Sequence, residues 1–535
     1  MALSFEKPKY SDRIGQTVQT VFGGIDLRKA ACDGAIYWTR NMCGDEYPLA
    51  AVRKRRRAVT GPDVDAGEAY GLFNAGGKLI CAAGGRLYVQ KDDGTFEEKG
   101  LLESGSKSFA ALGDYAIIFP DKKYYRLSDK TVGTLEETWT GTASFADGTY
   151  AGQDAKGCRI VTTGNVFPFG VGDAVTISGA NDAANNQTII IREISDNRKS
   201  LGFYENSFTV ATGQTLTIKR TVPDMDFICE NENRLWGCKG STIYASKLGD
   251  PFNWNVFDGL ASDSYAVDVG SAGDFTACFA YLGYPIFFKE DHIYKVYGSK
   301  PSNYQVMPSA TLGVMSGSFR SLAVAGEILY YLSKAGVMAY SGGVPQRVSE
   351  TLGDYRYRNG VAGSDGVRYY ISMEDDGNTG TTILYCYDTS VKQWYAEDVF
   401  KAVGFACADK LFAMNDDGDV FEFRSDEPNE GRLNSRLYFA DLVEGSPNKK
   451  STAKILVRVE LDAGAKLDVY MTFDSDNSAD ARVKVASLTS DGRKKSFYLP
   501  ILIRRCDHFS ISFEGFGMWR LYSLTREYSE GSPNT

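Results

Sequence analysis

The chain has 535 residues, 43% of them hydrophobic and 13% aromatic, which is enough to bury large cores and excludes general disorder. Its 59 basic and 68 acidic residues give a net charge of −9, which argues against a dedicated nucleic-acid-binding protein. The 56 Gly, 32 Tyr and 30 Phe are typical of an all-β protein, with Gly in turns and aromatic residues in strands.

Residues 1–60 differ in character from the rest and predict an extended N-terminal arm that could lie on a neighbouring subunit. No apolar signal core follows Met1, and no run approaches the roughly 18 apolar residues of a membrane span, so we expect no span. Near its end the arm carries a basic run, which suits an acidic groove of a partner subunit or passing DNA phosphate. A solvated strand edge is the alternative. The run consists of Arg53, Lys54, Arg55, Arg56 and Arg57.

A unit of four short antiparallel strands recurs over residues 61–137 and 222–425. Its clearest copy has strands at 318–325, 328–332, 336–340 and 346–349. The units recur roughly every 39–48 residues, the period of a propeller blade, with one longer interval of about 118. The sequence therefore predicts a six- or seven-bladed β-propeller, with irregular β-meanders as the alternative. The units begin near Tyr70, Phe109, Phe227, Phe275, Phe319, Asn359 and Lys401.

The longer interval holds five or six short strands with Gly-Asp and Asn-rich turns. We expect residues 138–221 to form a small inserted β-barrel or sandwich. The last unit, from Lys401 to Arg424, offers only three strands. A strand from Pro48–Val52, or from its extension to Val59, could supply the fourth and remove an exposed edge. After a polar break, alternating strands over 426–535 predict a C-terminal β-sandwich.

Few residues suit catalysis or metal binding. The two histidines, His292 and His508, lack a Ser or Cys in an elbow context, so we interpret both as structural and expect no enzyme and no metal or other cofactor. The ten cysteines are scattered singly, which indicates free thiols in a reducing cytoplasm. Paired carboxylates of a glycosidase are the minor enzymatic alternative.

Two acid-rich loops contain Asp-Gly steps, which tight hairpin turns favour. If the chain lines a DNA channel, these loops are candidates for its wall, because acidic surfaces do not bind phosphate. The candidate residues are Glu374, Asp375, Asp376, Asp416, Asp417 and Asp419.

Several segments resemble the tail hub, nozzle and packaged-DNA stabilisation proteins of short-tailed bacteriophages. Gly23-Gly24-Ile25-Asp26-Leu27, Asn41-Met42 and the basic run resemble their N-terminal arm. Their central propeller is similar to residues 285–298, 301–304, 313–314, 317–318 and 336–340. The pattern covers residues 15–425.

The resemblance implies a structural protein of the virion tail, assembled in the host cytoplasm as a ring, usually a homo-hexamer. It also implies a place below the portal and its adaptor, docking of tail fibres or spikes, and transient contact with passing double-stranded DNA. Two alternatives remain open: a propeller-type carbohydrate- or protein-binding adhesin, and a tail-tip protein of a long-tailed phage.

Overall fold

The computed structural model describes residues 14–28, 33–150, 152–203, 208–354, 356–375, 380–446, 448–476, 482–489, 492–501 and 505–530. Over these ranges the protein is all-β, as predicted. Contacts divide the chain into two compact units, Pro62–Phe319 and the combination of Met1–Gly61 with Arg320–Thr535. Besides strands, the described residues form four 3-10 helices: Ala183–Asn185, Pro301–Asn303, Phe319–Ser321 and Glu350–Leu352.

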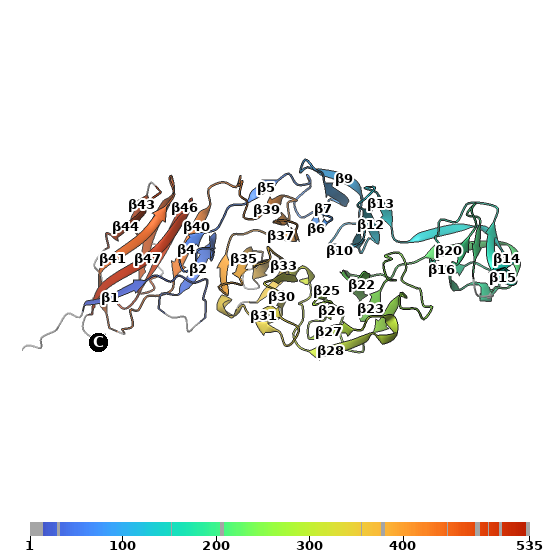
Figure 1. The fold of residues 1–535 in the computed structure, drawn as a ribbon. Coiled ribbons are helices and arrows are strands. Elements are labelled where there is room, and N and C mark those ends of the chain that lie inside the picture. The colour runs from blue at the N-terminus through green and yellow to red at the C-terminus, as the bar shows by residue number, and fades with distance from the viewer. Residues whose placement is uncertain are drawn as a thin grey trace, which may run out of the picture. The chain divides into compact units, whose positions relative to one another are not determined.

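The unit Pro62–Phe319 contains four-stranded antiparallel sheets whose strands follow chain order (Figure 1). The first strands of consecutive sheets contact one another. The four sheets are β6 (Ala69–Ala75), β7 (Lys78–Ala83), β8 (Arg86–Gln90) and β9 (Phe96–Leu101); β10 (Ser108–Leu112), β11 (Tyr115–Phe119), β12 (Lys123–Arg126) and β13 (Val132–Thr134); β21 (Phe227–Asn231), β22 (Arg234–Lys239), β23 (Thr242–Ala245) and β24 (Tyr265–Asp268); and β25 (Ala277–Tyr281), β26 (Tyr284–Phe288), β27 (His292–Tyr297) and β28 (Gln305–Ala310).

The second strand of each sheet is a continuous apolar run, such as Ala116–Phe119, rather than an alternating one. Side chains on both faces of these strands are buried. The second and third of the four sheets each pack against a neighbouring sheet on either side. The turn from β6 to β7 uses Gly76 and Gly77, both at positive φ, as a two-residue hairpin requires.

A separate antiparallel sheet interrupts this unit between β13 and β21 and spans Glu137–Arg220, whereas the insertion was expected over 138–221. It has its own core, which includes Phe145, Ile160 and Leu216. Its strands lie in the order β17-β16-β20-β14-β15-β19-β18. Their bounds are β14 (Glu137–Tyr150), β15 (Gln153–Thr162), β16 (Ala174–Ser178), β17 (Thr188–Ile190), β18 (Glu193–Ile194), β19 (Ser200–Gly202) and β20 (Ala211–Arg220).

The other unit contributes three more four-stranded sheets. They are β29 (Ala323–Ala325), β30 (Ile328–Ser333), β31 (Gly336–Tyr340) and β32 (Gln346–Arg347); β33 (Tyr357–Ser364), β34 (Arg368–Asp375), β35 (Thr382–Asp388) and β36 (Gln393–Ala396); and β37 (Ala402–Cys407), β38 (Leu411–Asn415) and β39 (Val420–Glu422), completed by β5 (Arg57–Val59).

Strand β5 comes from the N-terminal segment and pairs with β39, with Val59 opposite Val420. The fourth strand of the sheet that contains β37, β38 and β39 therefore comes from the extension to Val59. The strand Ala50–Val52 instead pairs with Trp519–Glu530 near the C-terminus. The side-chain amide of Asn429 covers the outer edge of β5: it accepts from the Ala58 N–H at 2.7 Å and donates to the Ala58 carbonyl at 3.1 Å. This side chain takes the place of a further strand.

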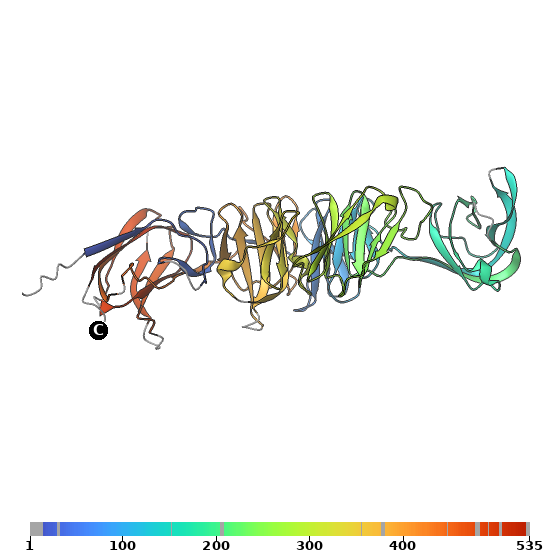
Figure 2. The same ribbon diagram turned by 90° about the horizontal axis from the view of Figure 1, so that it is seen from below.

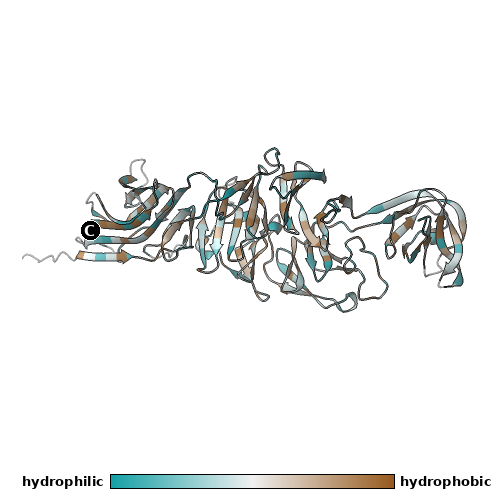
Figure 3. Ribbon diagram, turned by 45° about the horizontal axis from the view of Figure 1, so that its top comes forward, coloured by the Kyte–Doolittle hydropathy of each residue, from teal (hydrophilic) through white to brown (hydrophobic). Residues whose placement is uncertain are grey.

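Two sheets enclose one core at the C-terminal end of the chain. Hydrophobic and hydrophilic residues alternate along their strands (Figure 3), as in a sandwich with one buried face per sheet. One sheet holds β1 (Ile14–Gln19), β3 (Met42–Cys43), β4 (Ala50–Val52), β41 (Lys450–Leu461), β44 (Lys494–Leu499), β45 (Arg505–Cys506) and β47 (Trp519–Glu530); the other holds β2 (Ile36–Arg40), β40 (Asn434–Phe439), β42 (Lys466–Phe473), β43 (Val483–Thr489) and β46 (Phe509–Phe516).

The N-terminal segment is thus part of this sandwich, which corrects the expectation of an arm lying on a neighbouring subunit. All six residues of β1 pair with β47, and β2 pairs with β40 (Figure 2). Phe22, Ile36 and Met42 are buried in the sandwich core. Burial of these apolar anchors within the same chain accounts for their spacing, and no second subunit is needed to cover them.

Candidate functional site

The basic run lies where the N-terminal segment approaches β5, and two of its members point inward. The side chains of Arg53 and Arg56 are only 3% and 4% exposed. Arg56 binds Glu397 at 2.6 Å and Asp398 at 2.9 Å. Arg53 donates to Glu430 at 2.8 and 3.0 Å and lies 3.3 Å from Glu397.

The charges of the arginines, rather than burial, decide the direction in which the pKa values of Asp398 and Glu430 are shifted. Burial alone would raise the pKa of Asp398, but the nearby charges of Arg56 and Arg53 outweigh burial and lower that pKa. The pKa of Glu430 is lowered in the same way, against burial, by the hydrogen bond and charge of Arg53. The guanidinium of Arg56 also lies 4.5 Å from the centre of the Phe423 ring. Asp398 and Glu430 are therefore carboxylates at neutral pH.

The expectation that all five residues of the basic run offer their charge to a partner is corrected for Arg53 and Arg56, which are buried in ion pairs within the chain. Arg53 is paired with Glu430, which lies in the segment that leads to the sandwich, and Arg56 is paired with Asp398, which follows β36. Both arginines are therefore already engaged within the chain. Lys54 is exposed and only 3.9 Å from Asp426, while Arg55 and Arg57 are partly exposed. An interface role for Lys54, Arg55 and Arg57 stays a prediction.

The two acid-rich loops occupy corresponding places, each joining the second and third strands of its sheet. Glu374, at the end of β34, accepts from Arg358 at 2.9 Å and from the Gly380 N–H at 2.8 Å, and these bonds lower its pKa to about 2. Asp375 is partly exposed, and Asp376 lies outside the described residues.

In the second loop, Asp416 pairs with Lys401 at 2.9 Å, whereas Asp417 and Asp419 are exposed. The first carboxylate of each loop is thus neutralised locally, and the rest of the loop carries the acidic character. A place for these residues in a channel wall stays a prediction.

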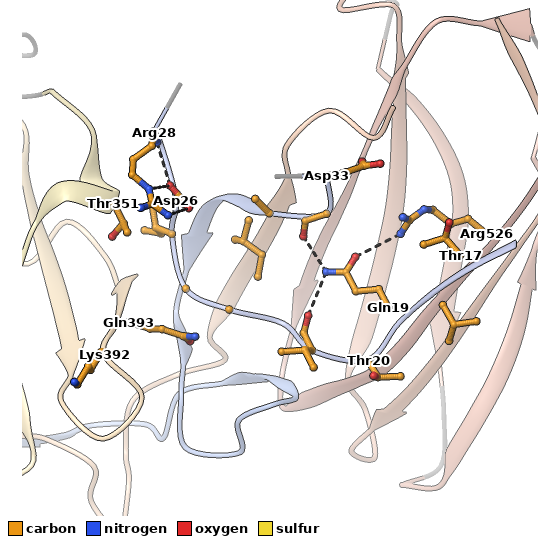
Figure 4. Close-up of a pocket in the computed structure, with 18 residues that line it drawn as sticks. Thr17, Gln19, Thr20, Asp26, Arg28, Asp33, Thr351, Lys392, Gln393 and Arg526 are labelled. Atoms are coloured by element: carbon orange, nitrogen blue, oxygen red, sulfur yellow. Dashed lines mark hydrogen bonds and ion pairs between the residues drawn. The ribbon is translucent and has the colours of Figure 1, made fainter. Parts of the chain in front are cut away.

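A pocket of about 600 Å³ lies against the Gly-Gly-Ile-Asp segment (Figure 4). The Ile25 N–H donates to the Trp394 carbonyl at 2.8 Å, and the Leu27 N–H donates to the Thr351 carbonyl at 2.7 Å. A Cβ on Gly24 would overlap the Trp394 carbonyl oxygen. The glycine therefore allows backbone to approach backbone. Residues 29–32 lie outside the described residues, and we assign no ligand to this pocket.

One catalytic-type arrangement was missed from the sequence. The Ser475 hydroxyl lies 2.7 Å from Nε2 of His508, and Asp507 Oδ2 lies 3.3 Å from its Nδ1. Ser475 and the preceding Asp474 both have positive φ, near +50°, which is strained for residues other than glycine. A hydroxyl next to an imidazole can act as a nucleophile in acyl transfer. His508 thus has a serine neighbour that no elbow pattern in the sequence indicated, and its interpretation as a structural residue stays a prediction.

The described residues also bear on metal ligands, membrane-spanning helices and disulfide bonds. Over those ranges, no group of three or more His, Cys, Asp and Glu side chains is placed to hold a metal ion. The helices described there include none with the length and apolar character to cross a membrane. The nine described cysteines are free thiols; eight are buried and Cys407 is exposed.

Comparisons with known proteins add little. No protein-family model matches the chain, and no curated protein matches it. Among solved structures, the computationally designed Ika8 protein is 11% identical, covers 69% of this chain and 99% of its own, and has a TM-score of 0.37. PorZ, a surface component of the type-IX secretion system of Porphyromonas gingivalis, is 13% identical, with coverages of 87% and 81% and a TM-score of 0.27.

The endosialidase of phage phi92 is 11% identical, with coverages of 71% and 70% and a TM-score of 0.24. At such low identities and TM-scores, these likenesses carry no argument about function.

Proposed function

We propose that this protein is a structural subunit of a bacteriophage tail, a hub or nozzle that continues the DNA channel below the portal. In this proposal the seven four-stranded sheets of the described ranges are the blades of one β-propeller. The subunit forms a homo-hexameric ring in the virion tail, is assembled in the host cytoplasm, binds portal or adaptor proteins and docks fibres or spikes.

One observation carries the proposal: seven of the described sheets have four strands each and follow one another along the chain. One inserted module interrupts them, and a strand from the N-terminal segment completes the last of them. This organisation covers the residues whose pattern resembles tail hub and nozzle proteins. A rigid β scaffold with exposed modules suits a part that bears load and docks partners. The net charge of −9 suits a surface past which DNA moves without binding.

Co-assembly tests this proposal. Analytical ultracentrifugation of the purified chain, mixed with a portal–adaptor complex of a short-tailed phage that encodes it, should give one larger species containing several copies of this chain. Independent sedimentation of the two components would contradict the proposal. In that case the adhesin and the long-tailed-phage tail-tip alternatives would gain weight.

A second candidate function rests on Ser475 and His508. If this pair hydrolyses esters, Ser475 Oγ attacks the acyl carbon, His508 takes the hydroxyl proton and returns it to the leaving alcohol, and water then releases the acid. A fluorophosphonate probe followed by peptide mass spectrometry separates the two functions. The structural proposal expects no more labelling of Ser475 than of Ser487, which bonds to Asp468 and not to a histidine. Selective labelling that is lost in His508→Gln would favour the hydrolase.

A further inference from the structure

The inserted sheet exposes one face on which nearly every side chain ends in a hydroxyl group. The face spans four neighbouring strands in the order β17-β16-β20-β14. We call it the hydroxyl face. It is made of Thr138, Thr140 and Thr142 on β14, Thr215, Thr217 and Lys219 on β20, Thr176 and Ser178 on β16, and Thr188 on β17.

These side chains lie in register across the strands. Thr140 pairs with Thr217, which pairs with Ser178, and Thr142 pairs with Thr215 in the next row. Thr138, Lys219, Thr176 and Thr188 form the remaining row. Neighbours therefore repeat about every 4.8 Å across strands and about every 6.8 Å along them.

The face is backed by a hydrophobic core. Residues that alternate with the hydroxyl positions, such as Trp139, Leu216 and Ile218, are buried in the module's core. The register of β14 shifts only after Ala143, beyond the last row. Hydroxyl groups touch at some positions, as at Thr176 and Thr188, 2.8 Å apart. The array is thus preorganised by regular pairing.

Its charge indicates what it could bind. Of the nine positions only Lys219 is charged, whereas about a quarter to a third of ordinary surface residues are charged. Anionic partners such as DNA need several Lys or Arg. The core of a protein–protein interface is enriched in aromatic, Met and Arg side chains, which this face lacks. Threonine offers a donor, an acceptor and a methyl group, which match the hydroxyls and C–H faces of a sugar.

We propose that the hydroxyl face binds a neutral polysaccharide, with sugar rings lying along the rows of threonine side chains. The proposal does not depend on the tail-hub function, because the hydroxyl face belongs to a module with a core of its own.

The test is affinity electrophoresis of the full chain in native gels containing dextran, mannan, galactan or a mixed-linkage β-glucan, with alginate as the anionic polymer. We expect at least one neutral polymer to retard the protein and alginate not to. The double variant Thr140→Glu with Thr217→Lys places opposite charges on a cross-strand pair, which preserves the pairing of the strands. It replaces two uncharged hydroxyl side chains in the middle of the face by charged ones. Binding should fall at least tenfold.

Two further variants sharpen the test. Thr140→Val with Thr217→Val keeps the β-branched shape and removes two hydroxyls, and should also weaken binding about tenfold. Thr163→Val changes an exposed threonine of the same module outside the face and should bind as the unchanged protein does. Lack of retardation by every neutral polymer, or unchanged binding in the Glu–Lys variant, would overturn the proposal. Unchanged binding in the Val variant would overturn the role of the hydroxyls.

Discussion

Replacement of Arg56 by alanine tests whether the buried ion cluster holds the N-terminal segment in place. Arg56 bonds to Glu397 and to both carboxylate oxygens of Asp398, and Glu397 is almost as buried as Arg56 itself. Removing one partner of a buried pair typically costs about 3–5 kcal/mol, because the remaining charges lose their compensation. We expect a loss of that size in the free energy of unfolding of the unit that contains Arg56.

The assay is urea denaturation followed by tryptophan fluorescence, since Trp394 is buried in the strand that precedes Glu397. Arg56→Lys should be intermediate, because lysine keeps the charge but cannot bond to two carboxylates in the same geometry. Lys54→Ala is the matched control: its exposed pair with Asp426 contributes about 0.2–1 kcal/mol at most. Equal losses for Arg56→Ala and Lys54→Ala would refute the assignment of a structural role to Arg56.

Three further predictions concern the ion cluster, Gly24 and the binding of DNA. The lowered pKa values of Asp398 and Glu430 stabilise the fold above the unfolded pKa values, about 4, so urea midpoints should fall as pH drops from 5 towards 2, and fall less in Arg56→Ala. Gly24→Ala should lower the melting temperature by overlapping Trp394, whereas Gly343→Ala, which meets open space, should not; equal melting temperatures would contradict the overlap. Fluorescence anisotropy should show DNA binding no tighter than about 10⁻⁴–10⁻⁶ M at physiological salt; nanomolar binding would exclude a passive channel wall.

Local patterns in the sequence predicted the strands better than their partners. Alternation in Leu467–Phe473 matches β42 (Lys466–Phe473), and the apolar runs matched the inner strands of the four-stranded sheets. The pairing of β1 with β47 joins residues some 500 positions apart, and no local periodicity records such a partner. The interpretation of the N-terminal segment as an arm was wrong for this reason.

Site residues were harder to predict, for similar reasons. Arg53 and Arg56 are buried while Lys54 and Arg55 are not, a spacing that fits no strand period. Their acidic partners could have been suspected, because Glu397 and Asp398 directly follow an apolar strand. Ser475 and His508 are 33 residues apart in the sequence and lie in two different connections between strands. No local sequence pattern shows that the two connections meet.

The central claim is that this chain builds a ring through which DNA passes, and negative-stain electron microscopy tests it most directly. Particles of the purified chain, alone and with its portal and adaptor, should show rings with a central hole and six-fold averages. Arg56→Ala, which acts within one subunit, should reduce the yield of folded protein without changing the ring symmetry. Monomers under all of these conditions, with or without binding to polysaccharide, would contradict the account.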